Sequence, residues 1–146
     1  MLLVMTAFAA VCEPDPGVTA VAAIPVEPLT IYFKSHAWGL NGYSAVLSLN
    51  KDPTRMPKPD AWECCPDDYR WPADSPPILV FRAHAGTLHI WDDGDRWHAP
   101  TTGSLATFVK FQRVDILTLS RMQDDPEAYG VQVIRNGTVP VPAARP

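Results

Sequence analysis

Two histidines and an arginine lie close together within residues 78–92, and imidazole groups are common ligands of zinc and copper. Alternating apolar and polar residues on both sides of Ala85-Gly86 predict a β-hairpin in which Arg82 faces His89. His84 and His89 are then diagonal neighbours on one face, about 7 to 8 Å apart at the backbone. Because the fixed positive charge of Arg82 lies between them, we expect neither a metal site nor a cofactor here.

A second group of potential ligands is the acidic segment Asp92-Asp93-Gly94-Asp95, which resembles part of a calcium-binding loop. An EF-hand loop needs a longer series of oxygen ligands that ends in a bidentate glutamate, and this segment lacks both. The residues therefore predict a tight turn whose carboxylates face water.

The three cysteines are Cys12 and the adjacent pair Cys64 and Cys65. Adjacent cysteines lack the Cys-x-x-Cys spacing of a zinc site. In an oxidising compartment we favour a disulfide from Cys12 to one of the pair, closing a loop of roughly fifty residues and contributing about 4 kcal/mol. A bridge between Cys64 and Cys65 would be strained. In a reducing compartment all three are expected to be small, mostly inert side chains.

Catalysis by a cysteine or serine would require a nearby base and an oxyanion donor. The sequence contains no Gly-x-Ser-x-Gly motif, and no histidine has a spacing from Cys64 or Cys65 that indicates a catalytic pair. An enzyme that combines Cys64 or Cys65 with His84 or His89, or that uses a metal, is therefore the third hypothesis. The balance of the sequence favours a protein that is not an enzyme.

Aromatic and basic residues form the best candidate for a binding surface. Tryptophan and tyrosine stack on sugar rings and also dominate the binding energy of protein interfaces. The candidates lie in a proline-rich stretch and around the predicted hairpin, and they are Trp62, Tyr69, Trp71, Arg82, His84, His89, Trp91 and Trp97. The alternative is that a given tryptophan fills the core beneath the proline-rich stretch, which is the commoner outcome for any one of them.

The elements that would position these residues are strands. The chain has 16 prolines, no sustained helical periodicity and several runs of β-branched and aromatic residues. Strands are predicted over residues 18–24, 29–34, 43–50, 78–84, 87–92, 107–121 and 129–134, with a bulge where the apolar alternation shifts after Phe111. The predicted fold is all-β, an antiparallel β-sandwich or open barrel of about six or seven short strands with one long Pro-rich loop over residues 51–77.

The start of the chain resembles an export signal. The apolar run from Leu2 to Val11 is shorter than the roughly 20 residues of a membrane span, but it suits the core of a signal peptide. Ala7-Phe8-Ala9 has the small residues that signal peptidase requires, although no basic residue precedes the apolar run. Cleavage after Ala9 is favoured over lipid attachment at Cys12, because Val11 is bulky. We expect a periplasmic or extracellular protein.

These patterns divide the chain into four parts: a signal peptide (1–9), an extended N-terminal segment (10–28), one β domain (29–135) and a flexible tail (136–146). The tail contains the glycosylation pattern Asn136-Gly137-Thr138, which carries little weight without a known source. The net charge of −4 argues against nucleic acid or an anionic membrane as the main partner. The leading hypothesis is an exported, non-enzymatic protein of the cell envelope that binds another protein. The second is a carbohydrate-binding module, and the oligomeric state is open.

Overall fold

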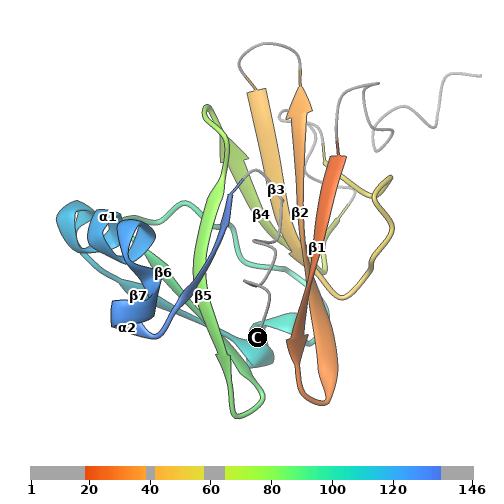
Figure 1. Ribbon diagram of the computed structural model, residues 1–146. Helices are drawn as coiled ribbons and strands as arrows, with labels where there is room; N and C mark the ends of the chain where they lie inside the picture. The colour runs from red at the N-terminus through yellow and green to blue at the C-terminus, as the bar shows by residue number, and fades with distance from the viewer. Residues whose placement is uncertain (1–18, 39–41, 58–64, 136–146) are drawn as a thin grey trace, which may run out of the picture.

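The computed structural model describes residues 19–38, 42–57 and 65–135 (Figure 1). These residues form eight strands in two four-stranded sheets that lie face to face, so the predicted all-β sandwich is confirmed. The first sheet has the order β1-β2-β3-β4, and the second has the order β7-β6-β5-β8. The strands of the first sheet are β1 (Thr19–Val26), β2 (Leu29–Trp38), β3 (Gly42–Ser48) and β4 (Tyr69–Ala73). Those of the second are β5 (Ile78–His84), β6 (Thr87–Asp92), β7 (Val109–Arg113) and β8 (Gln132–Arg135).

The first sheet is an antiparallel meander in which each strand pairs with its neighbours in the chain. The prediction of one long loop over residues 51–77 is wrong near its end, where β4 lies, because Tyr69 and Trp71 alternate in register with the apolar residues of β3. β3 is buried on both faces, since Ser44 to Ser48 are all buried. The reason is that part of the Pro-rich stretch packs on the outer face of this sheet and buries Met56 and Cys65 there.

The β5–β6 hairpin follows its predicted register, with Arg82 opposite His89 and Val80 opposite Trp91. Its two-residue turn places Ala85 at φ 50° and Gly86 at φ 74°, as a type I′ turn requires. The alternation then directs one set of side chains inward. Leu79, Phe81, Leu88 and Ile90 are all buried.

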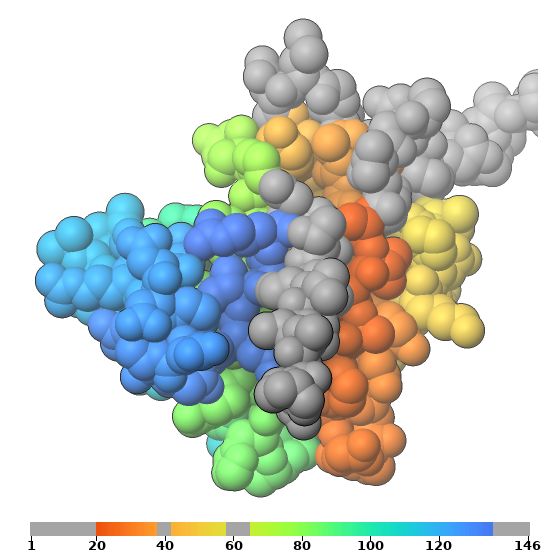
Figure 2. Space-filling view, viewed as in Figure 1, coloured from red at the N-terminus to blue at the C-terminus, as the bar shows by residue number. Residues whose placement is uncertain are grey.

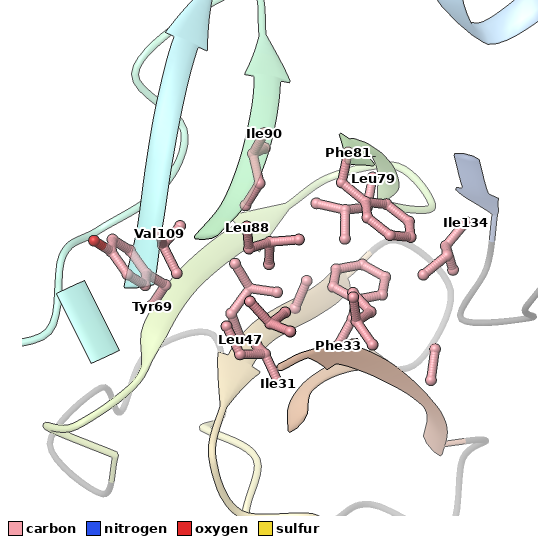
Figure 3. Packing of buried hydrophobic residues seen from close by; sticks show 14 of the residues in the cluster. Ile31, Phe33, Leu47, Tyr69, Leu79, Phe81, Leu88, Ile90, Val109 and Ile134 are labelled. Atoms are coloured by element: carbon pink, nitrogen blue, oxygen red, sulfur yellow. The ribbon is translucent and has the colours of Figure 1, made fainter. Parts of the chain in front are cut away.

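The core lies between the two sheets (Figure 3). Ile31, Phe33 and Leu47 of the first sheet point toward Leu79, Phe81, Leu88, Ile90 and Ile134 of the second. β-branched and aromatic side chains suit this position because they pack well on a pleated surface. At one end of the core, aromatic rings replace the aliphatic contacts.

Two predicted strands are wrong in the C-terminal third. Residues 107–121 do not form one long strand, because β7 ends at Arg113 and helix α1 (Ile116–Asp124) follows. The Asp115 side chain accepts a hydrogen bond from the Thr118 backbone N–H (2.8 Å) and so caps α1. The apparent bulge after Phe111 is the end of a strand.

The last predicted strand begins later than residue 129. Residues Pro126–Tyr129 form the short helix α2, with Pro126 in its first turn and Gly130 at φ 64° after its end. Proline favours helix starts and glycine favours helix ends, so both residues mark a helical turn. In the space-filling view, α1 and α2 protrude on the side of the second sheet away from β1 and β2 (Figure 2).

Several predictions fall outside the described residues. They are the signal peptide, Cys12, Trp62, Cys64, the tail 136–146 and the glycosylation pattern. In the part of the chain that the structure describes, no helix is long and apolar enough to cross a membrane.

Candidate functional site

The outer face of the second sheet is divided into a covered half and an open half. The covered half packs against α1 through a small apolar cluster made of Val80, Leu119, Met122, Val131 and Val133. The open half carries Arg82, His84, His89 and Lys110 beside the half-buried Trp91, and we call these five residues the basic face.

The register of three strands sets the geometry of the basic face. Arg82 of β5 pairs with His89 of β6, and His89 pairs in turn with Lys110 of β7. Directly opposed residues have Cβ atoms about 5 Å apart, so the three side chains form a row across the sheet. His84 is two residues along β5 from Arg82 and lies on the same face.

The pKa of His89 reflects its partial burial and the positive charges that surround it. The pKa of His89 is lowered, first by partial burial and then by the positive charges of Arg82, Lys110 and His84. The outward positions of β5, β6 and β7 hold no acidic residue in the described chain. A domain with a net charge of −4 therefore displays a patch of opposite sign.

Trp91 is the apolar member of the basic face and is held from two sides. The guanidinium carbon of Arg82 lies 5.6 Å from the centre of its ring, and the His89 ring is 6.4 Å away. The indole also packs against the apolar cluster under α1. These contacts fix an aromatic side chain inside a charged surface, so little of its rotamer freedom remains to be lost on binding.

The structure places the predicted surface residues in two separate regions. Arg82, His84, His89 and Trp91 share the basic face. Tyr69 and Trp71 are buried in the core, because their positions on β4 point toward the second sheet. Trp97 is half-buried, and its ring lies 5.4 Å from that of Trp71 and 6.3 Å from that of Phe33. These three aromatics fill the end of the sandwich.

Lys110 is the member of the basic face that the sequence did not indicate. It belongs to the segment interpreted as one long strand, and its neighbour β6 lies about twenty residues earlier in the chain. The parallel pairing of β6 and β7 is a non-local contact. The only sequence signal is the alternation of Val109, Lys110 and Phe111, which gives no indication of a partner strand.

Cys65 belongs to the Pro-rich stretch and lies on the other side of the molecule, at the outer face of the first sheet. It is buried, and its Sγ atom is 4.0 Å from the Arg55 carbonyl oxygen. It lines a cavity of about 610 Å³ together with Ser48, Asp68 and Arg55, and no histidine is among the described residues that line it. His84 and His89 lie on the outer face of the second sheet, so the cavity does not pair Cys65 with them. Since Cys12 and Cys64 are outside the described residues, the disulfide stays a prediction.

The same region contains a buried pair of charges. The Lys34 ammonium donates hydrogen bonds to the carbonyl oxygens of Asp52 (3.0 Å) and Arg55 (3.2 Å). Burial lowers the pKa of Lys34 and raises the pKa of Asp68, and each is partly offset by the charge of the other. Because Lys34 is fully buried and bonded to the backbone, its geometry suits a structural role.

The described residues contain no group of three or more histidine, cysteine, aspartate or glutamate side chains arranged to hold a metal ion. The basic face is thus the candidate site, because it brings exposed basic side chains together beside an aromatic one. No known protein family, curated protein or solved structure matches this chain, so its function is argued from the geometry of this face.

Proposed function

We propose that this protein is an exported, non-enzymatic binding protein whose basic face docks onto an acidic segment of another protein. The observation that carries the proposal is the row of Arg82, His89 and Lys110 across three strands, with no carboxylate at the neighbouring outward positions. Such a row favours a chain of carboxylates, because charge-assisted hydrogen bonds are the strong ones. Arginine and tryptophan are also the residues most enriched at the centres of protein interfaces.

A protein partner fits this face better than a neutral sugar. Sugar stacking needs an open aromatic plane, whereas the Trp91 ring is contacted by Arg82 and Trp71 is buried. Strand β6 and its neighbours offer a flat, charged surface instead of a groove. A carbohydrate-binding module remains the alternative that the binding experiment separates.

The test is a titration with a fluorescently labelled deca-glutamate peptide, followed by fluorescence anisotropy at low ionic strength. We expect saturable binding that weakens as salt rises, since exposed charges are screened over about 10 Å at 0.1 M. Arg82→Glu and Lys110→Glu should each weaken binding at least tenfold. Arg113→Glu is the matched control, because Arg113 is exposed on β7 but pairs with Asp92 on the opposite face.

Equal affinities of Arg82→Glu and Arg113→Glu would contradict the proposal. Tighter binding of a sulfated oligosaccharide than of the peptide would point to an anionic glycan as the partner. Quenching of tryptophan fluorescence by a neutral oligosaccharide, with no response to the peptide, would support the carbohydrate-binding alternative.

Export is the second part of the proposal and has its own test. Mass spectrometry of cell fractions should find the mature chain outside the cytosol with Ala10 as its first residue. A cytosolic chain that begins at Met1 would rule export out and leave the binding proposal to stand on its own.

A further inference from the structure

A small cavity lies at the far end of the second sheet from the β5–β6 turn. The end of β6, the connection between β4 and β5, and helix α1 meet there and enclose about 90 Å³. Three tryptophans line it, Trp71 and Trp97 from the core side of the second sheet and Trp91 from its outer face, and Arg96 lines it as well. The acidic side chain that lines it is Asp92.

The prediction that the carboxylates of residues 92–95 face water is wrong for Asp92, which is buried at the end of β6. Its two carboxylate oxygens have different surroundings. Oδ1 accepts a hydrogen bond from the backbone N–H of Asp93 (2.8 Å). Oδ2 is buried and has no hydrogen-bond partner. Burial raises the pKa of Asp92, and the nearby charge of Asp93 adds to this, while Arg96 and the backbone hydrogen bond oppose it. A buried carboxylate oxygen without a donor is costly, so this position calls for a group that can donate to it.

Arg96 does not supply that group. Its Nη2 atom lies 2.6 Å from Asp93 Oδ1, whereas its Nε atom is 3.7 Å from Asp92 and faces Oδ1. The guanidinium is also placed over the ring of Trp71, 5.6 Å from its centre. One arginine thus serves two carboxylates and leaves Asp92 Oδ2 unpaired.

We propose that this cavity binds the primary ammonium group of a small amine, with Asp92 Oδ2 as the acceptor and the indoles of Trp71 and Trp97, which lie on the same side of the sheet, beside it. Indole rings attract cations through their π faces, and desolvation strengthens this attraction. The volume equals that of about three water molecules, which suits an ammonium with a short alkyl chain. A quaternary ammonium lacks the N–H that Oδ2 needs.

The test uses propylammonium as the probe, with NMR detection of the tryptophan indole N–H signals. We expect saturable shifts of the indoles that line the cavity, with a dissociation constant in the millimolar range, as fits so small a ligand. Asp92→Asn should weaken binding at least tenfold. Asp95→Asn is the matched control, because Asp95 makes the same charge change in the same turn but is exposed.

Propanol and tetramethylammonium complete the experiment. Propanol has the same size without the charge, and tetramethylammonium has the charge without an N–H donor, so neither should cause saturable shifts. Equal binding of propanol, equal binding to Asp92→Asn, or no saturable shift with propylammonium would each overturn the proposal, the last showing that the cavity holds water only. Since the basic face is unchanged in Asp92→Asn, peptide binding by this variant separates the two proposals.

Discussion

Inward and outward side chains alternate along the strands of both sheets, but the two outer faces are covered by different kinds of segment. On the first sheet an irregular, proline-rich segment covers a face that includes polar residues, and the buried ones there are Lys34, His36, Ser44, Ser48 and Asp68. On the second sheet a regular helix, α1, covers an apolar half and leaves the basic face open.

The difference follows from how the backbone N–H and C=O groups of each covering segment find their hydrogen-bond partners. An irregular segment has no regular hydrogen-bond ladder of its own, and Lys34 of the sheet adds a donor to the partly buried carbonyl groups of Asp52 and Arg55. A helix bonds its own interior backbone groups, so it can pack through apolar contacts alone. Polar residues of the second sheet are therefore left exposed to solvent.

Among the substitutions that test this comparison, Lys34→Met is expected to change the stability of the protein most. The substitution removes one hydrogen bond to each of two carbonyls and leaves Asp68 buried without a nearby ammonium. We expect a loss of about 3 to 4 kcal/mol in the free energy of unfolding, measured by urea titration. Lys51→Met is the control, because Lys51 is exposed on the same covering segment, and it should change stability by less than about 0.5 kcal/mol. If the two variants unfold at the same urea concentration, the first sheet does not depend on the buried ammonium.

The contact of α1 with the second sheet should respond to Leu119→Ala. Leu119 is buried against Val80 and Met122, and its truncation leaves a cavity in an apolar cluster. The expected loss is about 2 to 3 kcal/mol, near the low end of the usual range because the cluster lies close to the surface. Leu117→Ala on the same helix is the control, since Leu117 is 67% exposed. A similar loss in both variants would mean that α1 acts through its helical propensity and not through packing.

The smallest expected effect is the contribution of His89, in the open half of the second sheet, to the pH dependence of stability. The folded-state pKa of His89 lies below the unfolded value, which is about 6.5. Between these two values the unfolded chain binds more protons, so this residue makes stability rise with pH up to about 6.5 and adds no slope above it. We expect His89→Gln to remove this slope, a change of under about 1 kcal/mol for a partly solvated group, measured by thermal unfolding from pH 4.5 to 8.

Lys110→Gln sharpens the same experiment. It removes one of the repelling charges but leaves the burial that is the first cause of the shift. The slope should therefore shrink without disappearing. An unchanged slope in both variants would show that His89 has the same pKa in the folded and unfolded chains.

Local patterns predicted the hairpin, and non-local contacts decided the rest. The β5–β6 register could be predicted because a two-residue turn and strict alternation fix it without reference to other strands. Arg82, His84, His89 and Trp91 were therefore placed correctly relative to one another. Lys110 could not be added, because nothing in its own segment says which strand it pairs with.

Lys34 and helix α1 show two further limits of predicting this structure from the sequence. Lys34 alternates with apolar neighbours, which predicts exposure, and only the path of a distant segment reverses this. In α1, the Asp115 and Thr118 cap was a usable signal, but the β-branched and aromatic residues of 107–121 dominated the interpretation. The fold class is robust to such errors because it depends on many strands, whereas a site depends on a few positions.

The parallel pairing of β6 with β7 has a consequence for when the basic face is complete. Arg82 and His89 come together as soon as the hairpin closes, a local event on the microsecond scale. Lys110 joins the row only after the intervening chain has crossed to the edge of the sheet, a slower step because its contacts are distant in sequence. Before that step the chain carries an incomplete row. Completion of the row marks the native state, so the binding that we propose for this face would begin only at the end of folding.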